Sequence, residues 1–274
     1  MDRIDQIFDY DPDFPRDVRD VATRINTGAI VREFTFATPF NRRRAAYMVR
    51  PEQERSSSPL VLFVHWYEPQ APNSNRNQFL QEAIKLSTQG CTSLLVETVW
   101  SDRDWFIKRT QAEDFQSSVE QVVELRIAMD LLMAERGADP SRFAYVGHDF
   151  GAMYGVLAGA ADPRPTAYVL MAGTSRFPDW FLYYPKLIGD EAEAFKKQFN
   201  SIDPVTLVPR LAPAPLLFQF GVRDVHVPTK RAEAFFEAAS EPKEMWWYES
   251  GHGLNGNAAN DRMDWLVEAL QLED

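Results

Sequence analysis

The stretch Tyr145-Val146-Gly147-His148-Asp149-Phe150-Gly151-Ala152 decides the fold of this 274-residue chain. A strand-like run leads into Gly-x-Asp-x-Gly, and a helical pattern begins at once. This form is typical of a nucleophile elbow, a tight turn that lifts one side chain above a sheet. The glycines are required because a Cβ would clash with neighbouring backbone. Asp149 is therefore the candidate nucleophile, although an aspartate here can also be a helix N-cap.

Two further polar residues follow later strand-like runs. The run ending at Phe220 leads into Gly221-Val222-Arg223-Asp224, and the last run leads into Ser250-Gly251-His252. The order nucleophile, acid, histidine, each just past a strand, is the order of a hydrolase triad on a parallel sheet. We expect Asp149, Asp224 and His252 to meet at one edge of the sheet, although each of the latter two can be a surface loop residue.

Apolar runs alternate with helical patterns over most of the chain. Ile30–Phe36 and Ala45–Val49 read as a hairpin. The later strands are expected at 60–64, 92–96, 143–146, 167–171, 216–220 and 244–248, and the helices at 77–88, 115–136, from 151, 230–239 and 258–272. Repeated strand–helix units predict an α/β fold with a mainly parallel central sheet and helices on both faces. Such sheets carry their sites at the carboxyl ends of the strands.

The chain divides into an arm and one domain. Residues 1–28 are polar and acidic, and we expect an N-terminal arm with one short helix at about 15–25. Residues 29–274 form the domain. Its less regular segment, about 174–212, is expected to form a short cap after the sixth strand, because it interrupts the alternation and is rich in aromatic residues.

Four motifs together resemble the α/β-hydrolase superfamily from about residue 30 to the end, and most of all its dienelactone-hydrolase-like branch. They are Val64-His65-Trp66-Tyr67, Gly147-His148-Asp149-Phe150-Gly151, Gly221-x-x-Asp224-x-x-Val227-Pro228 and Ser250-Gly251-His252-Gly253. The resemblance implies that Asp149 is the nucleophile, Asp224 the acid and His252 the base. It also implies oxyanion donors in the backbone N–H groups of Tyr67 and Phe150.

The chain departs from that branch in two places. Asp149 stands where the branch has Cys or Ser, and Trp66-Tyr67 stands where many relatives have glycine after the histidine. The elbow itself resembles those of epoxide hydrolases and of haloalkane or haloacetate dehalogenases. Many of these have Trp where this chain has Phe150, which weakens the expectation of a halide contact at that position.

A carboxylate nucleophile limits the chemistry. It is already ionised at pH 7, attacks an sp³ carbon and leaves a covalent alkyl ester. His252, oriented by Asp224, would then activate water to cleave that ester. Attack on a carboxylic ester would instead give an anhydride and expel a basic alkoxide. The main hypothesis is therefore a hydrolase of the epoxide hydrolase or dehalogenase type that needs no cofactor.

Aromatic residues are the candidates for substrate contact, and core packing is the alternative for each. Epoxide opening needs a proton donor, for which Tyr183, Tyr184, Tyr67 and Tyr154 are candidates. Halide release needs N–H donors or ring edges, for which Trp66, Trp100, Trp105 and Trp180 are candidates. The expected substrate-binding set is Trp66, Trp105, Trp180, Tyr183 and Tyr184.

Composition excludes several other classes. A net charge of −11 would repel nucleic acid, so a small molecule is the expected partner. Cys91 is the only cysteine, and the four histidines lack a metal-ligand spacing, so no metal is expected. No signal segment or long apolar run is visible, which predicts a cytoplasmic protein that does not enter a membrane. The oligomeric state stays open, and a homodimer is possible.

Two alternatives accompany the main hypothesis. The first is a dienelactone-hydrolase-like carboxylic ester hydrolase, in which Asp149 acts as a base on water or tolerates an activated ester. The second is a non-catalytic ligand-binding or interaction module on the same fold. Asp224 and His252 argue against the second, because a binding module needs neither.

Overall fold

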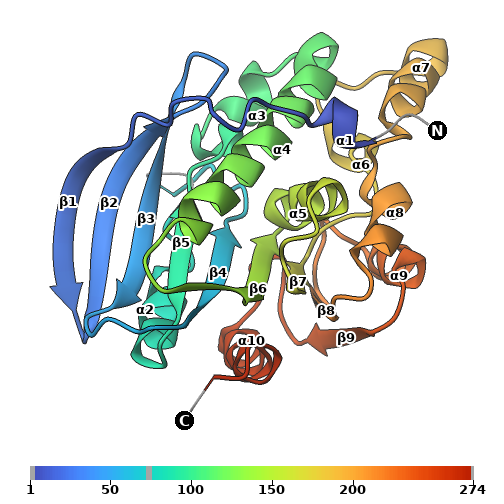
Figure 1. The fold of residues 1–274 in the computed structure, drawn as a ribbon. Coiled ribbons are helices and arrows are strands. Elements are labelled where there is room, and N and C mark those ends of the chain that lie inside the picture. The colour runs from blue at the N-terminus through green and yellow to red at the C-terminus, as the bar shows by residue number, and fades with distance from the viewer. Residues whose placement is uncertain (1–3, 72–75, 273–274) are drawn as a thin grey trace.

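The computed structural model describes residues 4–71 and 76–272, and residues 1–3 of the expected arm lie outside them (Figure 1). Within these residues nine strands form one sheet in the order β1-β2-β3-β5-β4-β6-β7-β8-β9. The strands are β1 Arg19–Asn26, β2 Ala29–Ala37, β3 Arg43–Pro51, β4 Ser58–Val64, β5 Thr92–Val96, β6 Ala138–His148, β7 Ala167–Met171, β8 Leu216–Gly221 and β9 Lys243–Tyr248.

The sheet is mainly parallel, as expected. Each neighbouring pair from β5 to β9 in the sheet order is parallel. The three pairs at the other side of the sheet, β1 with β2, β2 with β3 and β3 with β5, are antiparallel. Strands β4, β5 and β7 are buried along their whole length. The apolar runs 60–64, 94–96 and 167–171 within them follow from this, because helices cover both faces of a parallel sheet.

Helices cover the two faces of the sheet in two groups, which confirms the predicted fold class (Figure 1). Leu125 of α4 and Leu157 of α5 belong to the core on one face, and Ile84 of α2 and Leu266 of α10 belong to the core on the other. The helices are α1 Ile4–Ile7, α2 Leu80–Thr88, α3 Trp105–Lys108, α4 Gln111–Met133, α5 Phe150–Ala161, α6 Pro178–Phe181, α7 Gly189–Phe199, α8 Pro204–Leu207, α9 Thr229–Ala238 and α10 Gly256–Ala269, with short 3₁₀ turns η1 Val99–Ser101 and η2 Val208–Leu211.

The N-terminal segment corrects one expectation. The helix predicted at about 15–25 is wrong, because residues 19–26 form β1, an exposed edge strand paired with β2. Thr27 and Gly28 join the two strands, and both have positive φ angles, 53° and 79°. A two-residue turn with this geometry matches the twist of a β-hairpin. This extra strand also makes β7, after which the expected cap segment begins, the seventh strand rather than the sixth.

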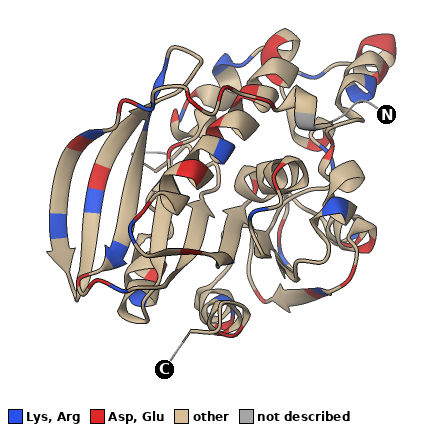
Figure 2. Ribbon diagram, viewed as in Figure 1, with Lys and Arg blue, Asp and Glu red and all other residues tan. Residues whose placement is uncertain are grey.

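The segment between β7 and β8 contains α6, α7, α8 and η2. Phe177, Phe181 and Phe199 are buried there, and their rings contact one another and Tyr154 of α5. This aromatic cluster fixes the segment to the domain. Acidic and basic residues are interspersed over the helices and the edge strands (Figure 2), so the excess negative charge is not gathered on one element.

Candidate active site

The elbow has the strained geometry that its glycines predict. Asp149 lies between the end of β6 and the start of α5 with φ 55° and ψ −116°. A Cβ at Gly147 would strike the carbonyl oxygen of Gly151, and one at Gly151 would strike that of Val64. The Asp149 side chain makes no capping bond to α5, so the N-cap interpretation does not account for it. Strain of this kind collects at functional sites.

The three predicted triad residues come together. His252 Nδ1 lies 2.8 Å from Asp224 Oδ2, and His252 Nε2 lies 3.7 Å from Asp149 Oδ1. Asp224 is fixed in turn, because its Oδ1 accepts the backbone N–H groups of His226 and Val227 at 2.8 and 3.0 Å. Asp149 and Asp224 are buried, at 2% and 8% exposed, and the His252 side chain is 9% exposed.

The two oxygens of Asp149 have different surroundings. The backbone N–H of Tyr67, one predicted oxyanion donor, points to Asp149 Oδ2 at 3.4 Å. Phe150, the other, is the first residue of α5, beside the carboxylate. Asp149 Oδ1 is buried and has no hydrogen-bond partner among the described residues. One oxygen is therefore held by the Tyr67 N–H, and the other makes no hydrogen bond among the described residues.

The electrostatics of the site favour a charged histidine at rest. Burial lowers the pKa of His252, but the carboxylates of Asp149 and Asp224 outweigh it and raise that pKa to about 9. Burial also opposes the charge of Asp224, yet the hydrogen bond from His252 holds the Asp224 pKa below its usual range. At neutral pH the resting site is thus an imidazolium between two carboxylates.

A second layer of hydrogen bonds, which the sequence did not reveal, fixes the two loops beside the triad. His148 Nε2 donates to the carbonyl of His252 at 2.9 Å, and the Gln78 amide donates to His148 Nδ1 at 2.7 Å. Gln78 also accepts the backbone N–H of Trp66 at 3.1 Å. Burial holds the pKa of His148 well below its usual range, so this relay is neutral. No sequence signal marks Gln78, because its partners lie far from it in the chain.

A cavity of about 760 Å³ opens above Asp149 and His252. It holds three of the expected substrate-binding residues. Its full lining is Trp66, Tyr67, Glu68, Pro69, Gln70, Phe106, Asp149, Phe150, Asp179, Trp180, Tyr183, Val225, His226, Pro228, Arg231 and His252. Of these, Asp179, Arg231 and His226 were not expected to face the substrate.

Two expected substrate contacts are corrected, because Trp105 and Tyr184 are not part of this lining. Trp105 packs edge-on against Phe150 with ring centroids 5.1 Å apart, so it supports the cavity wall from behind. Tyr184 gives its backbone carbonyl to Arg109, and its side chain is half exposed outside the cavity. Trp105 thus serves packing, the simpler of the two interpretations, whereas Tyr184 contacts Arg109 through its backbone.

Some of the side chains expected to donate a hydrogen bond to the substrate already bond to other protein groups, and others do not. The hydroxyl of Tyr67 donates to the Arg103 carbonyl at 2.7 Å, that of Tyr154 lies 2.9 Å from the Ser118 hydroxyl, and the Trp100 indole donates to the His65 carbonyl at 2.9 Å. The indole nitrogens of Trp66 and Trp180 are buried and without a partner among the described residues. These two N–H groups are available to a ligand in the cavity.

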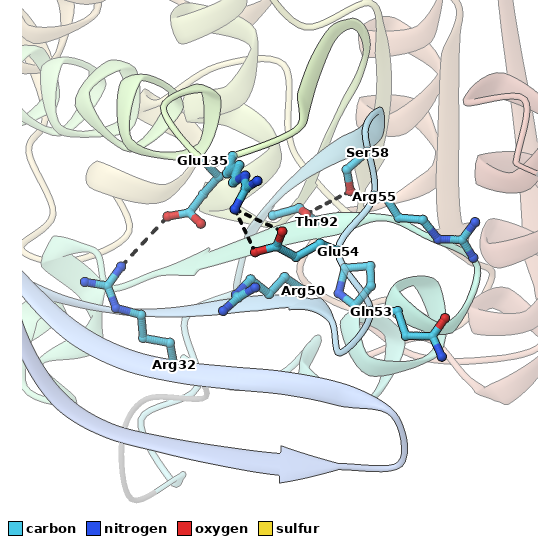
Figure 3. Close-up of a pocket in the computed structure, with 10 residues that line it drawn as sticks. Arg32, Arg50, Gln53, Glu54, Arg55, Ser58, Thr92 and Glu135 are labelled. Atoms are coloured by element: carbon cyan, nitrogen blue, oxygen red, sulfur yellow. Dashed lines mark hydrogen bonds and ion pairs between the residues drawn. The ribbon is translucent and has the colours of Figure 1, made fainter.

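A second cavity, of about 310 Å³, lies at the other end of the sheet (Figure 3). Ser58 and Thr92, at the amino ends of β4 and β5, form part of its lining, and their hydroxyls bond to each other at 2.9 Å. Two of its arginines are paired with carboxylates, Arg136 with Glu54 at 3.0 Å and Arg32 with Glu135 at 3.8 Å. It contains none of the predicted site residues.

In the described part of the chain, no three or more His, Cys, Asp or Glu side chains are grouped so that they could hold a metal ion. Over the same residues, none of the helices combines the length and the apolar character that spanning a membrane requires.

Comparisons with known proteins find likeness in structure alone. No protein-family model matches the chain, and no curated protein matches its sequence. An acetyl xylan esterase from Paenibacillus sp. R4 superimposes with a TM-score of 0.77 at 16% identity, covering 97% of this chain and 92% of that one. Acetyl xylan esterase 1 from Thermoanaerobacterium sp. JW/SL YS485 gives 0.75 at 15%, covering 97% and 92%.

A protein assigned as a dienelactone hydrolase, from Klebsiella pneumoniae subsp. pneumoniae MGH 78578, gives a TM-score of 0.64 at 18% identity, covering 89% of this chain and 98% of that one. At such identities the likeness shows how the chain folds. Together with the sheet order and the elbow, it shows that this chain has the α/β-hydrolase fold.

Proposed function

We propose that this chain is a hydrolase in which Asp149 attacks an sp³ carbon and water activated by His252 cleaves the resulting alkyl ester. The observation that supports it best is the state of Asp149. One carboxylate oxygen faces the Tyr67 N–H at 3.4 Å, and the other makes no hydrogen bond among the described residues and faces His252 Nε2 at 3.7 Å, above the strained turn. A carboxylate held this way is oriented for attack.

The proposed reaction has two steps, alkylation of Asp149 and hydrolysis of the resulting ester. Asp149 Oδ1 forms a bond to the substrate carbon while the bond to the leaving group breaks and its electron pair departs with that group. His252 Nε2 then takes a proton from water, and the hydroxide adds to Asp149 Cγ. The backbone N–H of Tyr67 stabilises the oxyanion. Collapse breaks the bond from Cγ to the alkoxide oxygen, and the alkoxide takes the proton of the new Asp149 carboxylic acid, so that an alcohol leaves and the carboxylate is restored.

The free donors in the cavity favour a halide over an epoxide. The unpartnered indole N–H groups of Trp66 and Trp180 suit a departing anion that needs no proton. Epoxide opening requires a proton donor. Of the candidate tyrosines, Tyr67 and Tyr183 line the cavity, and the Tyr67 hydroxyl already donates to the Arg103 carbonyl, which leaves Tyr183. Tyr183 is 79% exposed, which makes it poorly placed to hold a proton at a defined position.

Hydrolysis of a carboxylic ester is the second candidate. The structural neighbours are named as acetyl xylan esterases and a dienelactone hydrolase, and these names fit the ester alternative better than epoxide hydrolysis or dehalogenation. In that reaction Asp149 would act as a base on water. The carboxylate at the nucleophile position argues against it, because ester attack by Asp149 would have to expel a basic alkoxide.

The variant His252→Ala tests the proposal. With the base removed, the second step stalls, and incubation with haloalkanes, haloacids and epoxides should add a substrate-sized mass to the intact protein. The matched control is the double variant His252→Ala/Asp149→Asn, which should show no adduct. An adduct that persists in the double variant, or wild-type turnover of aryl esters alone, would refute the alkyl-ester mechanism. Ligand binding without any turnover would support the non-catalytic alternative.

A further inference from the structure

His226 lies beside the triad at the open side of the cavity. Its side chain is exposed, and its ring centroid is 5.2 Å from that of His252 at an angle of 71°. The ring stacks on Trp180 with centroids 5.6 Å apart. Its backbone N–H is held by Asp224, the same carboxylate that orients His252. A titratable ring is thus fixed between the buried histidine and solvent.

His252 needs a route for protons. Hydrolysis of an alkyl halide releases one proton per turnover, and the proposed mechanism places it on His252 Nε2. That atom is buried and has no hydrogen-bond partner among the described residues. The carboxylates of Asp149 and Asp224 keep His252 charged at rest, with a pKa of about 9. Once Asp149 is alkylated it loses its charge, and His252 must give up its proton before it can act as a base.

We propose that His226 is the proton-transfer residue that carries this proton from His252 to solvent. The inference rests on the proposed function, because it assigns a role only if His252 activates water. In the step, the N–H bond at His252 Nε2 breaks and one forms at the His226 imidazole through a bridging water. His226 then loses the proton to solvent. No other bond changes, and no electrons are transferred.

Charged side chains of several elements lie around His226. Asp224 bonds to its backbone from the same loop, Asp179 of α6 and Glu68 of the loop after β4 line the same cavity, and Arg231 of α9 is the cation of that lining outside the histidines. Arg231 lies 3.4 Å from Asp179 and is balanced by it.

The variant His226→Phe tests the proposal with 2-phenylethyl bromide, a neutral aromatic halide suited to the aromatic cavity. Phenylalanine keeps a ring against Trp180 but cannot carry a proton. In a rapid-quench experiment, the first burst of bromide should match that of the wild type within about twofold. Steady-state turnover in dilute buffer should fall by at least about tenfold, and added imidazole should restore it, as expected for a missing proton-transfer group. Val222→Ala, an exposed change in the same loop but outside the cavity lining, should alter neither quantity.

Three results would overturn the inference. Equal turnover of His226→Phe and wild type in dilute buffer would show that His226 carries no proton. A loss that imidazole does not restore would show that the ring only shapes the cavity. Absence of the bromide burst in the wild type would refute the proposed function itself, and with it the proton route, so the two failures are distinguishable.

Discussion

The two ends of the sheet carry cavities of opposite character. At the carboxyl ends of the strands, the Asp149 cavity contains four buried side-chain atoms without a partner, on Asp149, His252, Trp66 and Trp180. At the amino ends, the second cavity is rich in arginine, and its charges are paired or open to water (Figure 3). Leaving a buried polar group unsatisfied costs about 1–3 kcal/mol, so an accumulation of such atoms needs a reason. A ligand that satisfies them on binding supplies that reason.

The two ends of the sheet also differ in what they contribute to function and to stability. The unsatisfied atoms lie at the end of the sheet where His252 meets the strained turn at Asp149. The other end carries surface ion pairs, which contribute little to stability. We therefore expect substitutions at the Asp149 end of the sheet to change activity strongly. Substitutions at the other end should have little effect on activity.

The largest effect should come from Asp149→Asn. This change keeps the side-chain shape at the strained turn but removes the nucleophilic charge, so turnover should fall by about 10⁴-fold or more. Steady-state kinetics with whichever halide or epoxide labels His252→Ala would measure it. Retention of a tenth of the wild-type rate would mean that Asp149 is not the nucleophile.

Asp224→Asn should lower turnover by about 10³- to 10⁴-fold, because His252 loses the partner that fixes its tautomer and orientation. The alkylation step does not use His252, so the adduct on Asp149 should accumulate and be visible by intact mass. Asp139→Asn, near the amino ends of the strands, is the control and should leave turnover unchanged. A slow first step in Asp224→Asn would contradict the assigned order of steps.

A buried and an exposed ion pair should differ in how much they contribute to the free energy of unfolding. Arg109 and Asp114, whose side chains are 4% and 3% exposed, form a buried pair that also bonds the carbonyls of Phe181 and Tyr184 in the cap. Arg109→Ala should cost about 3–5 kcal/mol in urea unfolding, because it leaves a buried charge without a partner. Arg136→Ala removes an exposed pair with Glu54 and should cost at most about 1 kcal/mol. Equal costs would contradict the comparison.

The smallest predicted effect concerns the charge on His252. Asp149→Asn removes one of the two carboxylates that raise its pKa to about 9, so NMR titration of the variant should give a lower pKa. Because the folded-state pKa lies above the ordinary value, the stabilisation from protonated His252 is complete below pH 6.5 and is lost as pH rises through about 9. Thermal unfolding of the wild type should show this decline, and the variant should show less of it.

Much of the fold and the candidate site can be read from local sequence. The buried strands appear as continuous apolar runs, and the glycines around Asp149 mark a turn that only a crowded backbone requires. The edge strand β1 was missed because its side chains face water and its pattern is polar. Gly28 was the available signal, since glycine readily adopts the positive φ that a two-residue hairpin turn requires.

The substrate side was less predictable. Trp105 and Trp66 are equally aromatic in the sequence, yet one packs behind Phe150 and the other faces the cavity. Gln78 and His226 carry no local signal, because their roles depend on residues brought near them by the sheet.

The sequence by itself determined the α/β-hydrolase fold and the order of Asp149, Asp224 and His252 at three strand ends, because backbone crowding and strand burial act over a few neighbouring residues. Only the tertiary structure decided which aromatic rings line the cavity, which oxygen of Asp149 is free, and that His226 lies beside His252. These depend on contacts between loops more than twenty residues apart in the chain, where distance and burial follow from packing rather than from local pattern.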